Sequence, residues 1–567
     1  MSLIDWLVMC IFLLFVTIYG TWKTRGSKNI KSYLLANKST PWYTIALSIM
    51  ATQASAITFL STPGQAYVDG MRFVMFYLGL PVAMIILSIT AVPIYHKLNV
   101  YTAYEYLESR FDLKNRLLGS ILFLTQRGLA AGFTIFAPAL IISLLLGWNI
   151  QITIFGIGIL VIIYTTIGGT NAVNKTHLHQ MIIIMFGMVT AFFMIYNLLP
   201  ENVSALDAAY VAGKLGKLNA IDFSFDLNNK YTFWSGIIGG TFLMLSYFGT
   251  DQSQVQRYLA GSSVTQSRMG LLMNGFLKIP MQFFILFIGA MVFVFFQFIQ
   301  PPVFFNTNEV NNVKASGYSR EFSDLEKRYA DIHVQKQNDI YNMLDAIRVD
   351  DNISEEKYKA QALKKIESAK AIREEALDVM EKTNPDLDRN DTNYIFLNFV
   401  VNFLPVGLIG LVLAAILSAS MSSTSAELNA LASTTVIDIY KRVVSKNESD
   451  EHYLKVSKLA TVFWGVYAII FASFANMLGS LIEAVNILGS LFYGTILGLF
   501  LVAFYFKRVG SNAVFIGGAI AETVVIACYI FTDIPFLWFN LIGCALVILS
   551  SSMLAFFMDN ARQSELQ

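Results

Sequence analysis

The sequence predicts an all-α polytopic membrane protein with about thirteen transmembrane helices. Only 14% of its 567 residues are charged and 55% are hydrophobic, and the mean hydropathy is +0.56. Soluble proteins carry about 25% charged residues, so this chain is strongly depleted of them. Runs of about 20 apolar residues, each long enough to cross about 30 Å of hydrocarbon, recur from residue 3 to residue 557. The net charge of +1 offers no basic surface for a nucleic acid.

The charges between the apolar runs predict the orientation of the helices. With the N-terminus outside, the inner loops hold 20 Lys and Arg residues, whereas the short outer loops hold four. Because Lys and Arg gather in cytoplasmic loops, we expect the N-terminus outside and the C-terminus inside, with 558–567 as a short cytoplasmic tail. The expected helices cover residues 3–22, 42–62, 71–95, 117–146, 150–167, 179–199, 233–256, 269–299, 394–430, 456–476, 481–506, 511–531 and 535–557.

One hydrophilic segment, residues 306–393, does not fit a membrane. It carries 14 Lys and Arg against 19 Asp and Glu, and stretches such as 354–370 have the composition of a charged helix. We therefore expect a helical insertion on the outer face. It is either a solvated appendage or a docking surface or lid over the outer entrance, with an unknown partner.

Two of the expected helices are interrupted by small and polar residues, at 48–64 and at 246–257. Matched interruptions in two halves of a chain indicate an inverted-repeat secondary transporter, with ion and substrate bound near the midplane of the membrane. Small-residue helix packing is the alternative explanation. It accounts poorly for Gln53, Asp251 and Gln252.

The interrupted helices also divide the chain into parts. Residues 1–22 form an extra N-terminal transmembrane helix, which no Lys or Arg precedes, unlike a secretory signal. The first five-helix half is expected at 42–199. The second is expected at 233–506, around the insertion, and two C-terminal helices follow within 511–557.

A third helix carries a face suited to a hard cation. Ala419, Ser422 and Ser423 stand at i, i+3 and i+4, so they share one face of the helix. Two hydroxyls and a carbonyl there, opposite loosened carbonyls of the first interrupted helix, would form an oxygen cage for Na⁺. Plain packing of a serine-rich face is the alternative.

These motifs resemble the sodium/solute symporter family, which includes sodium/glucose, sodium/iodide, monocarboxylate, multivitamin and sialic-acid carriers. The resemblance runs from about residue 3 to 557, apart from the insertion. It implies a leucine-transporter-like fold of two inverted five-helix repeats with extra helices, working by alternating access. Its marks are the break at 48–64, Tyr104–Phe111, Ala137–Leu140, Gln256–Ala260 with Lys278 beyond it, Ser422–Ser423 ahead of Leu428–Asn429, and Asp438–Arg442.

The resemblance implies a sodium site built from neutral oxygens. By motif, the carbonyls of Ala51, Ala54 and Ala419 and the hydroxyls of Ser422 and Ser423 would bind the coupling Na⁺. Na⁺ is the one cofactor expected.

The resemblance also implies a solute site, with features that argue against a hexose. Tyr247 falls where the family has an aromatic inner gate, and Lys278 matches a lysine near the sugar pocket. Where sugar carriers have Gln, Glu and Asn, this chain has Thr58, Tyr77 and Met244. A hexose would leave hydroxyls buried and unpaired at such a site.

Arg127 points instead to an anionic solute. It lies within an apolar helix, and its guanidinium matches a carboxylate bidentately. Sialic-acid carriers are similar in having an arginine in this helix, with Ser and Thr of the first interrupted helix on the same carboxylate, and Ser55 and Thr58 match those positions. The alternative is that Arg127 lies near the inner end of its helix and snorkels to the interface.

His177 replaces an acidic residue that many family members have for a second cation or a proton. Without that anionic ligand, one Na⁺ per cycle is expected, and pH-sensitive transport is conceivable because histidine titrates near neutral pH. The alternative is a plain surface histidine at the start of a cytoplasmic helix.

We therefore expect a multi-pass sodium symporter of the plasma membrane, or of the inner membrane in a bacterium. It would import a small organic solute, anionic as in sialic-acid or monocarboxylate carriers, or alternatively a hexose, polyol or N-acetyl sugar. Its partners would be Na⁺, the solute and the lipid bilayer. An enzyme is not expected because no His, Asp or Cys cluster has catalytic spacing, and a channel would need a filter or a charged ring. A structural receptor acting through the insertion is the remaining alternative.

Overall fold

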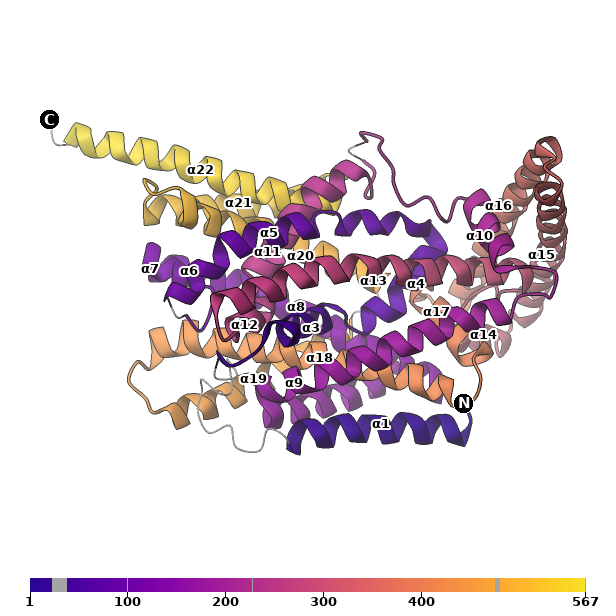
Figure 1. Cartoon of the computed structure of the whole chain (residues 1–567), viewed down its shortest axis with the longest axis horizontal. Helices are drawn as coiled ribbons and strands as arrows, with labels where there is room; N and C mark the ends of the chain where they lie inside the picture. Colours follow the sequence, from indigo (N-terminus) through magenta and orange to yellow (C-terminus); the bar gives the residue numbers. More distant parts are fainter. Residues whose placement is uncertain (23–37, 99, 227, 475–479, 566–567) are drawn as a thin grey trace.

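The computed structural model describes residues 1–22, 38–98, 100–226, 228–474 and 480–565, without the side chains of 16–22, 168–178 and 559–565. Over these ranges the chain is helical, with one isolated bridge between Thr40 and Gly261. Figure 1 shows long helices running side by side, with the N-terminus and the insertion at one end and the C-terminus at the other. The two termini thus lie at opposite ends of the bundle. This placement agrees with the prediction of an outer N-terminus and an inner C-terminus.

Hydropathy and length give the number of membrane crossings. Within the described ranges, ten helices are long and apolar enough to span a membrane, and two shorter apolar helices cover Leu3–Phe15 and Ser235–Gly249. One of the ten, Ala56–Leu98, turns back at Gly70, whose φ of +73° favours glycine, so it contains two crossings. The two separate helices predicted at 150–167 and 179–199 form one helix in the structure, Ile150–Asn197, and both apolar runs lie within it.

The crossing segments follow the predicted order. Those before residue 200 are α1 (Leu3–Trp22), α3 (Trp42–Gln53) with α4 (Ala56–Asp69), η2 (Gly70–Tyr77) with α5 (Leu80–Ile89) and α6 (Ala91–Leu98), α8 (Leu113–Leu146), and the spans Ile150–Ile167 and His179–Asn197 of α9 (Ile150–Asn197). Those after it are η3 (Ser235–Gly239) with α11 (Gly240–Gly249) and α12 (Gln252–Leu259), α13 (Val264–Phe298), α18 (Leu408–Thr434) with η4 (Thr435–Val444), α19 (Asp450–Ala472), α20 (Leu481–Tyr505), α21 (Ser511–Phe531) and α22 (Phe536–Glu565).

Both predicted interruptions are breaks in helices. The backbones of Ala54 and Ser55 leave the helical conformation between α3 and α4. Thr250 and Asp251 separate α11 from α12, and the Asp251 carboxylate caps α12 by accepting a hydrogen bond from Ser253 N at 2.9 Å. Each break exposes backbone groups inside the helix bundle, where a transporter binds its ions and solute.

The prediction of one helix over 394–430 is wrong. The structure has α17 (Thr392–Phe403) and then α18, separated by a turn that contains Pro405 and Gly407. Pro405 has no backbone N–H to donate, and Gly407 adopts a φ of +88°, so the helix cannot continue. Asp5 of α1 fixes the new start, because its Oδ1 accepts a hydrogen bond from Gly407 N at 2.6 Å.

The predicted insertion is helical. It consists of α14 (Thr307–Lys314), α15 (Ser319–Arg348) and α16 (Asn352–Thr383), and α15 and α16 pack along one another. Phe322 and Met380 belong to a small hydrophobic core between these helices, separate from the main core of the bundle. The insertion thus has its own packing while it stays anchored at the N-terminal end of the bundle (Figure 1).

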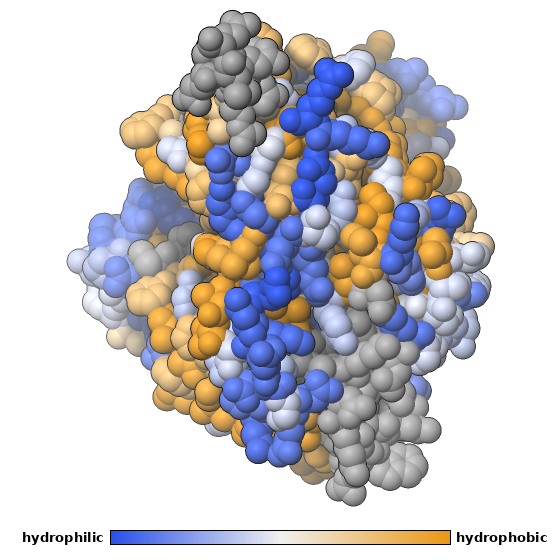
Figure 2. All heavy atoms as spheres, turned by 90° about the vertical axis from the view of Figure 1, so that its left-hand side faces the viewer, coloured by the Kyte–Doolittle hydropathy of each residue, from blue (hydrophilic) through white to orange (hydrophobic). Residues whose placement is uncertain are grey.

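The opposite end of the bundle has a polar centre. Figure 2 looks onto the end away from the insertion and shows hydrophilic residues gathered through its middle, with hydrophobic residues on both sides of them. Such a pattern suits an end face that meets water while its rim meets lipid. Short helix α7 (Glu105–Arg110) lies at this end, and α10 (Ala205–Lys214) lies near the insertion.

Candidate functional site

A cavity of about 80 Å³ lies beside the break between α3 and α4. Its wall also takes residues from η2, α8, α11, α18 and α20, so both interrupted regions contribute. Five of the six predicted solute-binding residues line this cavity, together with the predicted gate Tyr247: Ser55, Thr58, Tyr77, Arg127 and Met244. Sequence reasoning missed other residues of the wall, among them Gln53, Thr134, Glu427, Asn486 and Tyr493.

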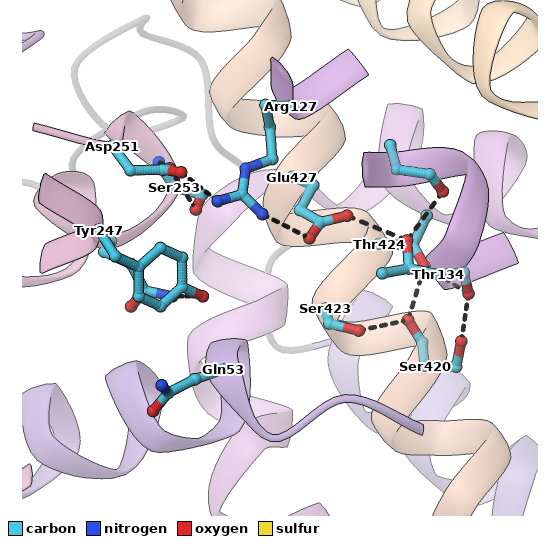
Figure 3. A network of polar contacts seen from close by, with 12 residues as sticks. Gln53, Arg127, Thr134, Tyr247, Asp251, Ser253, Ser420, Ser423, Thr424 and Glu427 are labelled. Atoms are coloured by element: carbon cyan, nitrogen blue, oxygen red, sulfur yellow. Dashed lines mark hydrogen bonds and ion pairs between the residues drawn. The ribbon is translucent and has the colours of Figure 1, made fainter. Parts of the chain in front are cut away.

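Arg127 on α8 is the centre of the site's electrostatics. Its side chain is buried at 3% exposure, and its Nη2 forms an ion pair with Asp251 and donates to Tyr493 OH at 2.6 Å. Its Nη1 pairs with Glu427 Oε1 at 3.1 Å (Figure 3). The snorkelling alternative for Arg127 is therefore wrong, because the guanidinium points into the bundle and is held by carboxylates from α18 and the α11–α12 break.

Thr134 links this charge cluster to the polar face of α18. Its hydroxyl lies 3.0 Å from Glu427 Oε2, and its carbonyl accepts from Ser420 Oγ at 2.6 Å and Thr424 Oγ1 at 3.3 Å. Figure 3 shows the row that results, from Asp251 through Arg127 and Glu427 to Thr134 and the serines of α18. The predicted sodium face and the solute cavity are thus parts of one connected polar network.

The five predicted sodium ligands come from two elements that pack together, α18 and the α3–α4 break. In a continuous helix, the amides of Ser55 and Thr58 would donate to the carbonyls of Ala51 and Ala54. Here Thr58 N donates to Ser55 O at 3.0 Å, and no backbone bond between Ser55 and Ala51 occurs in the described ranges. The break therefore leaves the carbonyls of Ala51 and Ala54 without the backbone bonds of a continuous helix.

The α18 side of this site is buried and rich in hydroxyls. Ala419, Ser422 and Ser423 are at most 2% exposed. Ser423 Oγ lies 3.1 Å from both Ala419 O and Ser420 O, whereas Ser422 Oγ has no hydrogen-bond partner among the described residues. An orphaned buried hydroxyl is costly, and a cation would satisfy it. The donor set therefore fits a monovalent cation held by neutral oxygens.

Lys278 differs from its sequence-based assignment. It lies on α13, is fully buried, and does not line the cavity. Its Nζ has no hydrogen-bond partner in the part of the chain that the structure describes, and neither do the side-chain oxygens of Asn274 and Gln282, four residues to either side. The structure thus does not bring Lys278 to the solute cavity. His177, the predicted second-cation position, lies in α9, and its side chain is outside the described part of the structure.

Hydrogen bonds join neighbouring elements on either side of the cavity. Towards the insertion, Ser480 Oγ before α20 donates to Gln65 Oε1 of α4 at 2.9 Å. Towards the other end, Tyr104 OH donates to Thr250 O at 2.8 Å. Tyr247 lies between the cavity and α12, and its hydroxyl accepts from Gln254 Nε2 at 2.6 Å. Hydrogen bonds between neighbouring elements therefore lie on both sides of the cavity along the bundle.

Comparison with known proteins identifies relatives. The sequence model of the sodium:solute symporter family matches residues 33–315 and 385–521. The sodium/sialic acid symporter NanT of Aliivibrio fischeri is 25% identical over 99% of this chain and 95% of its own. The sodium-coupled monocarboxylate transporter 1 of Xenopus laevis is 33% identical over 48% of this chain, which spans 43% of that relative.

A solved structure supports the fold. A Na⁺-coupled sialic acid symporter in a substrate-bound, outward-open state superposes with a TM-score of 0.75 over 98% of both chains, at 22% identity. Identity at that level establishes the shared fold and no more. The residues 316–384 of the insertion fall outside the matched family segments.

Removal of the orphaned hydroxyl tests the sodium face. We expect Ser422→Ala to raise the sodium concentration for half-maximal thermal stabilisation several-fold, because one oxygen ligand is lost. The matched control is Ser457→Ala on α19, whose buried hydroxyl is also without a partner among the described residues. Melting curves of the purified protein in Na⁺ and in K⁺ measure both. Equal sodium dependence in Ser422→Ala and the unmodified protein would contradict the assignment.

Proposed function

Since the chain belongs to the sodium:solute symporter family, we propose that it imports a small carboxylate-bearing solute through the cavity beside Arg127. The protein is a multi-pass membrane transporter, and Na⁺ is its coupling ion. Its relatives include a sialic acid symporter, monocarboxylate transporters, an iodide cotransporter and a multivitamin transporter. The choice of solute class for this chain rests on its own residues.

One observation carries the proposal, which is the position of a buried guanidinium on the cavity wall. Arg127 shares that wall with Ser55 and Thr58 of the broken first helix. A guanidinium offers a carboxylate two parallel N–H donors, and neighbouring hydroxyls can donate to the same oxygens. Arg127 Nε has no hydrogen-bond partner within the described chain, so part of its donor capacity is unused.

The carboxylates of Asp251 and Glu427 set a condition on anion binding. Both pair with Arg127, so the three groups carry a surplus of one negative charge when all are ionised. A solute carboxylate that engages the Nη atoms must replace one of these partners. Glu427 is the partner expected to yield, because it lines the cavity, whereas Asp251 is also fixed by Ser253 and Tyr493.

Sodium would couple to the solute through the broken first helix. Na⁺ held by Ala51, Ala54, Ala419, Ser422 and Ser423 would fasten this break to α18. Ser55 and Thr58, next along the chain, would then be held in position to meet the solute. Sodium and solute must therefore raise each other's affinity by the same factor. We expect one Na⁺ per cycle, because His177 stands where many relatives have an acidic residue.

Alternating access would use the two breaks as hinges. The proposed repeats, 42–199 and 233–506, each begin with an interrupted helix. Loss of the Ser480–Gln65 contact would open the outer side, and movement of Tyr247 would open the inner side. Each contact involves at least one element that borders the cavity, so occupancy of the cavity can bias both contacts.

A neutral sugar or polyol is a second candidate. It is favoured because the Arg127 guanidinium is already paired with two carboxylates. Such a solute would leave the guanidinium with its two carboxylates and would pair its hydroxyls with Gln53, Thr58 and Asn486. The two candidates differ in the expected effect of losing the paired N–H donors of the Arg127 guanidinium. Only the binding of an anionic solute should depend on these donors.

Thermal stabilisation by a small panel of solutes separates the candidates. Sialic acid or lactate is expected to raise the melting temperature in Na⁺ and much less in K⁺. Arg127→Lys should weaken this binding by about tenfold or more, because an ammonium cannot reproduce the bidentate contact. Stabilisation by glucose or a polyol alone, unchanged in Arg127→Lys, would overturn the anionic solute and leave sodium symport in place.

A second variant tests the condition set by the carboxylates. Glu427→Gln should tighten carboxylate binding several-fold, because it removes a competing negative charge and keeps an oxygen that can accept from Arg127. Glu483→Gln, at the outer start of α20, is the control. Titration calorimetry in Na⁺ measures both variants. Weaker binding by Glu427→Gln would show that the solute does not displace this carboxylate.

A further inference from the structure

A second and larger cavity, of about 440 Å³, lies between the insertion and the bundle. Its walls come from α15 and α16, the segment 389–392, and the outer ends of α4, α13 and α17. Most of the insertion's contribution belongs to residues 316–384, which fall outside the family match. This outer pocket is therefore a feature that the insertion adds to the shared fold.

The outer pocket has a surplus of positive charge. Five basic and two acidic side chains line it. Both acidic groups are already used, since Asp391 pairs with Arg373 at 2.6 Å and Glu374 pairs with Arg389 at 2.9 Å. The three lysines of the wall form no ion pair within the described residues: Lys217, Lys336 and Lys370.

Lys336 is the clearest sign of a missing counterion. Its side chain is buried at 6% exposure. Burial lowers its pKa to about 8, so the ammonium is still mostly charged at neutral pH. The Lys336 ammonium has no ion-pair partner in the described structure, and an anion in the pocket would supply one. Burial also lowers the pKa of Lys217 to about 8, and the Nζ of this lysine donates to Val68 O.

The remainder of the wall suits an organic molecule better than a bare inorganic ion. Tyr67, Phe293 and Tyr329 present aromatic faces. Gln297 is 2% exposed, and its Oε1 has no partner in the described structure, so it can accept a hydrogen bond from a hydroxyl or an N–H. A volume of about 440 Å³ is within the range of small-molecule sites.

We propose that the outer pocket is a second binding site, built by the insertion, for a small organic carboxylate with hydroxyl or amide groups. The carboxylate pairs with Lys336 and Lys370, and the polar groups of the ligand meet Gln297. Only one part of this proposal rests on the proposed function, namely the suggestion that the ligand of the outer pocket is the transported solute itself. Its cations and its cavity stand apart from Arg127 and from the sodium face.

Occupation of the outer pocket would act on the broken first helix. Tyr67 and Val68, at the outer end of α4, form part of the wall. Lys217 Nζ donates to Val68 O at 2.5 Å, and Lys217 O accepts from Met71 N at 2.9 Å, so the same lysine holds the turn after α4. A bound carboxylate would therefore stabilise α4 in its present position.

Titration calorimetry of the full-length protein in K⁺, with sialic acid, lactate and inorganic phosphate as separate probes, tests the proposal. Without Na⁺, solute binding in the central cavity should be weak, whereas binding in the outer pocket should be unchanged. We expect sodium-independent binding of sialic acid that persists in Arg127→Lys. Lys336→Gln and Lys370→Gln should each weaken it by about tenfold, the loss of one charge-assisted hydrogen bond.

Matched controls separate the lysines of the pocket from surface lysines. Lys327→Gln on α15 and Lys364→Gln on α16 lie on the same helices outside the pocket and should bind as the unmodified protein does. Lys336→Gln should melt no lower than the unmodified protein when no anion is present, because it removes one positive charge from a wall with a surplus of positive charge and breaks no ion pair of the described residues. That result would show that weak binding is not a folding defect.

The outcomes that overturn this site differ from those that overturn the proposed function. No sodium-independent binding of either carboxylate, equal affinity in Lys336→Gln, or binding of phosphate as tight as that of sialic acid would each reject the outer pocket as a carboxylate site. Loss of sodium-dependent binding in Arg127→Lys concerns the central cavity alone. Sodium-independent binding that Arg127→Lys abolishes would assign the effect to the cavity and reject the outer pocket.

Discussion

The structure depends on one buried charge, the guanidinium of Arg127, because it must be paired wherever the helices move. Asp251 at the second break and Glu427 on α18 supply its partners, which ties three helical elements together around the cavity. Breaking a buried pair leaves an uncompensated charge at a cost of about 3–5 kcal/mol. A solute that supplies its own carboxylate could take over a partner's role without that cost, so in the proposed mechanism this network would also select the solute.

The sodium face has the same constraint, because its buried polar groups also need partners, although these groups are neutral. The break beside Ala54 frees carbonyls, and α18 presents an orphaned hydroxyl at Ser422. Unsatisfied polar groups inside a membrane protein are costly, so both halves of this face are incomplete without a cation. Thr134 joins the sodium face to the charge cluster. The proposed ion and solute sites are therefore connected through hydrogen bonds, which would give reciprocal coupling a physical route.

Local sequence was enough to predict the crossings and both helix breaks, because hydropathy and interrupted apolar runs are local signals. The Pro405–Gly407 turn was also visible in the sequence, yet the apolar composition around it suggested one helix. The partners of Arg127 were not predictable, since Asp251 and Glu427 lie 124 and 300 residues away along the chain. Intramembrane acids opposite an intramembrane arginine were the available signal. Lys278 matched a motif, but only tertiary packing could show that it faces away from the cavity.

The measurement that tests the account most directly is uptake of labelled sialic acid or lactate into proteoliposomes under an imposed gradient. With high external Na⁺ and none inside, the account predicts accumulation above the external concentration of at least one of the two carboxylates. Replacing Na⁺ by K⁺, or equalising Na⁺ across the membrane, should abolish that accumulation. Equal uptake under all three conditions would contradict sodium coupling, and accumulation of a neutral sugar in place of both carboxylates would contradict the role assigned to Arg127.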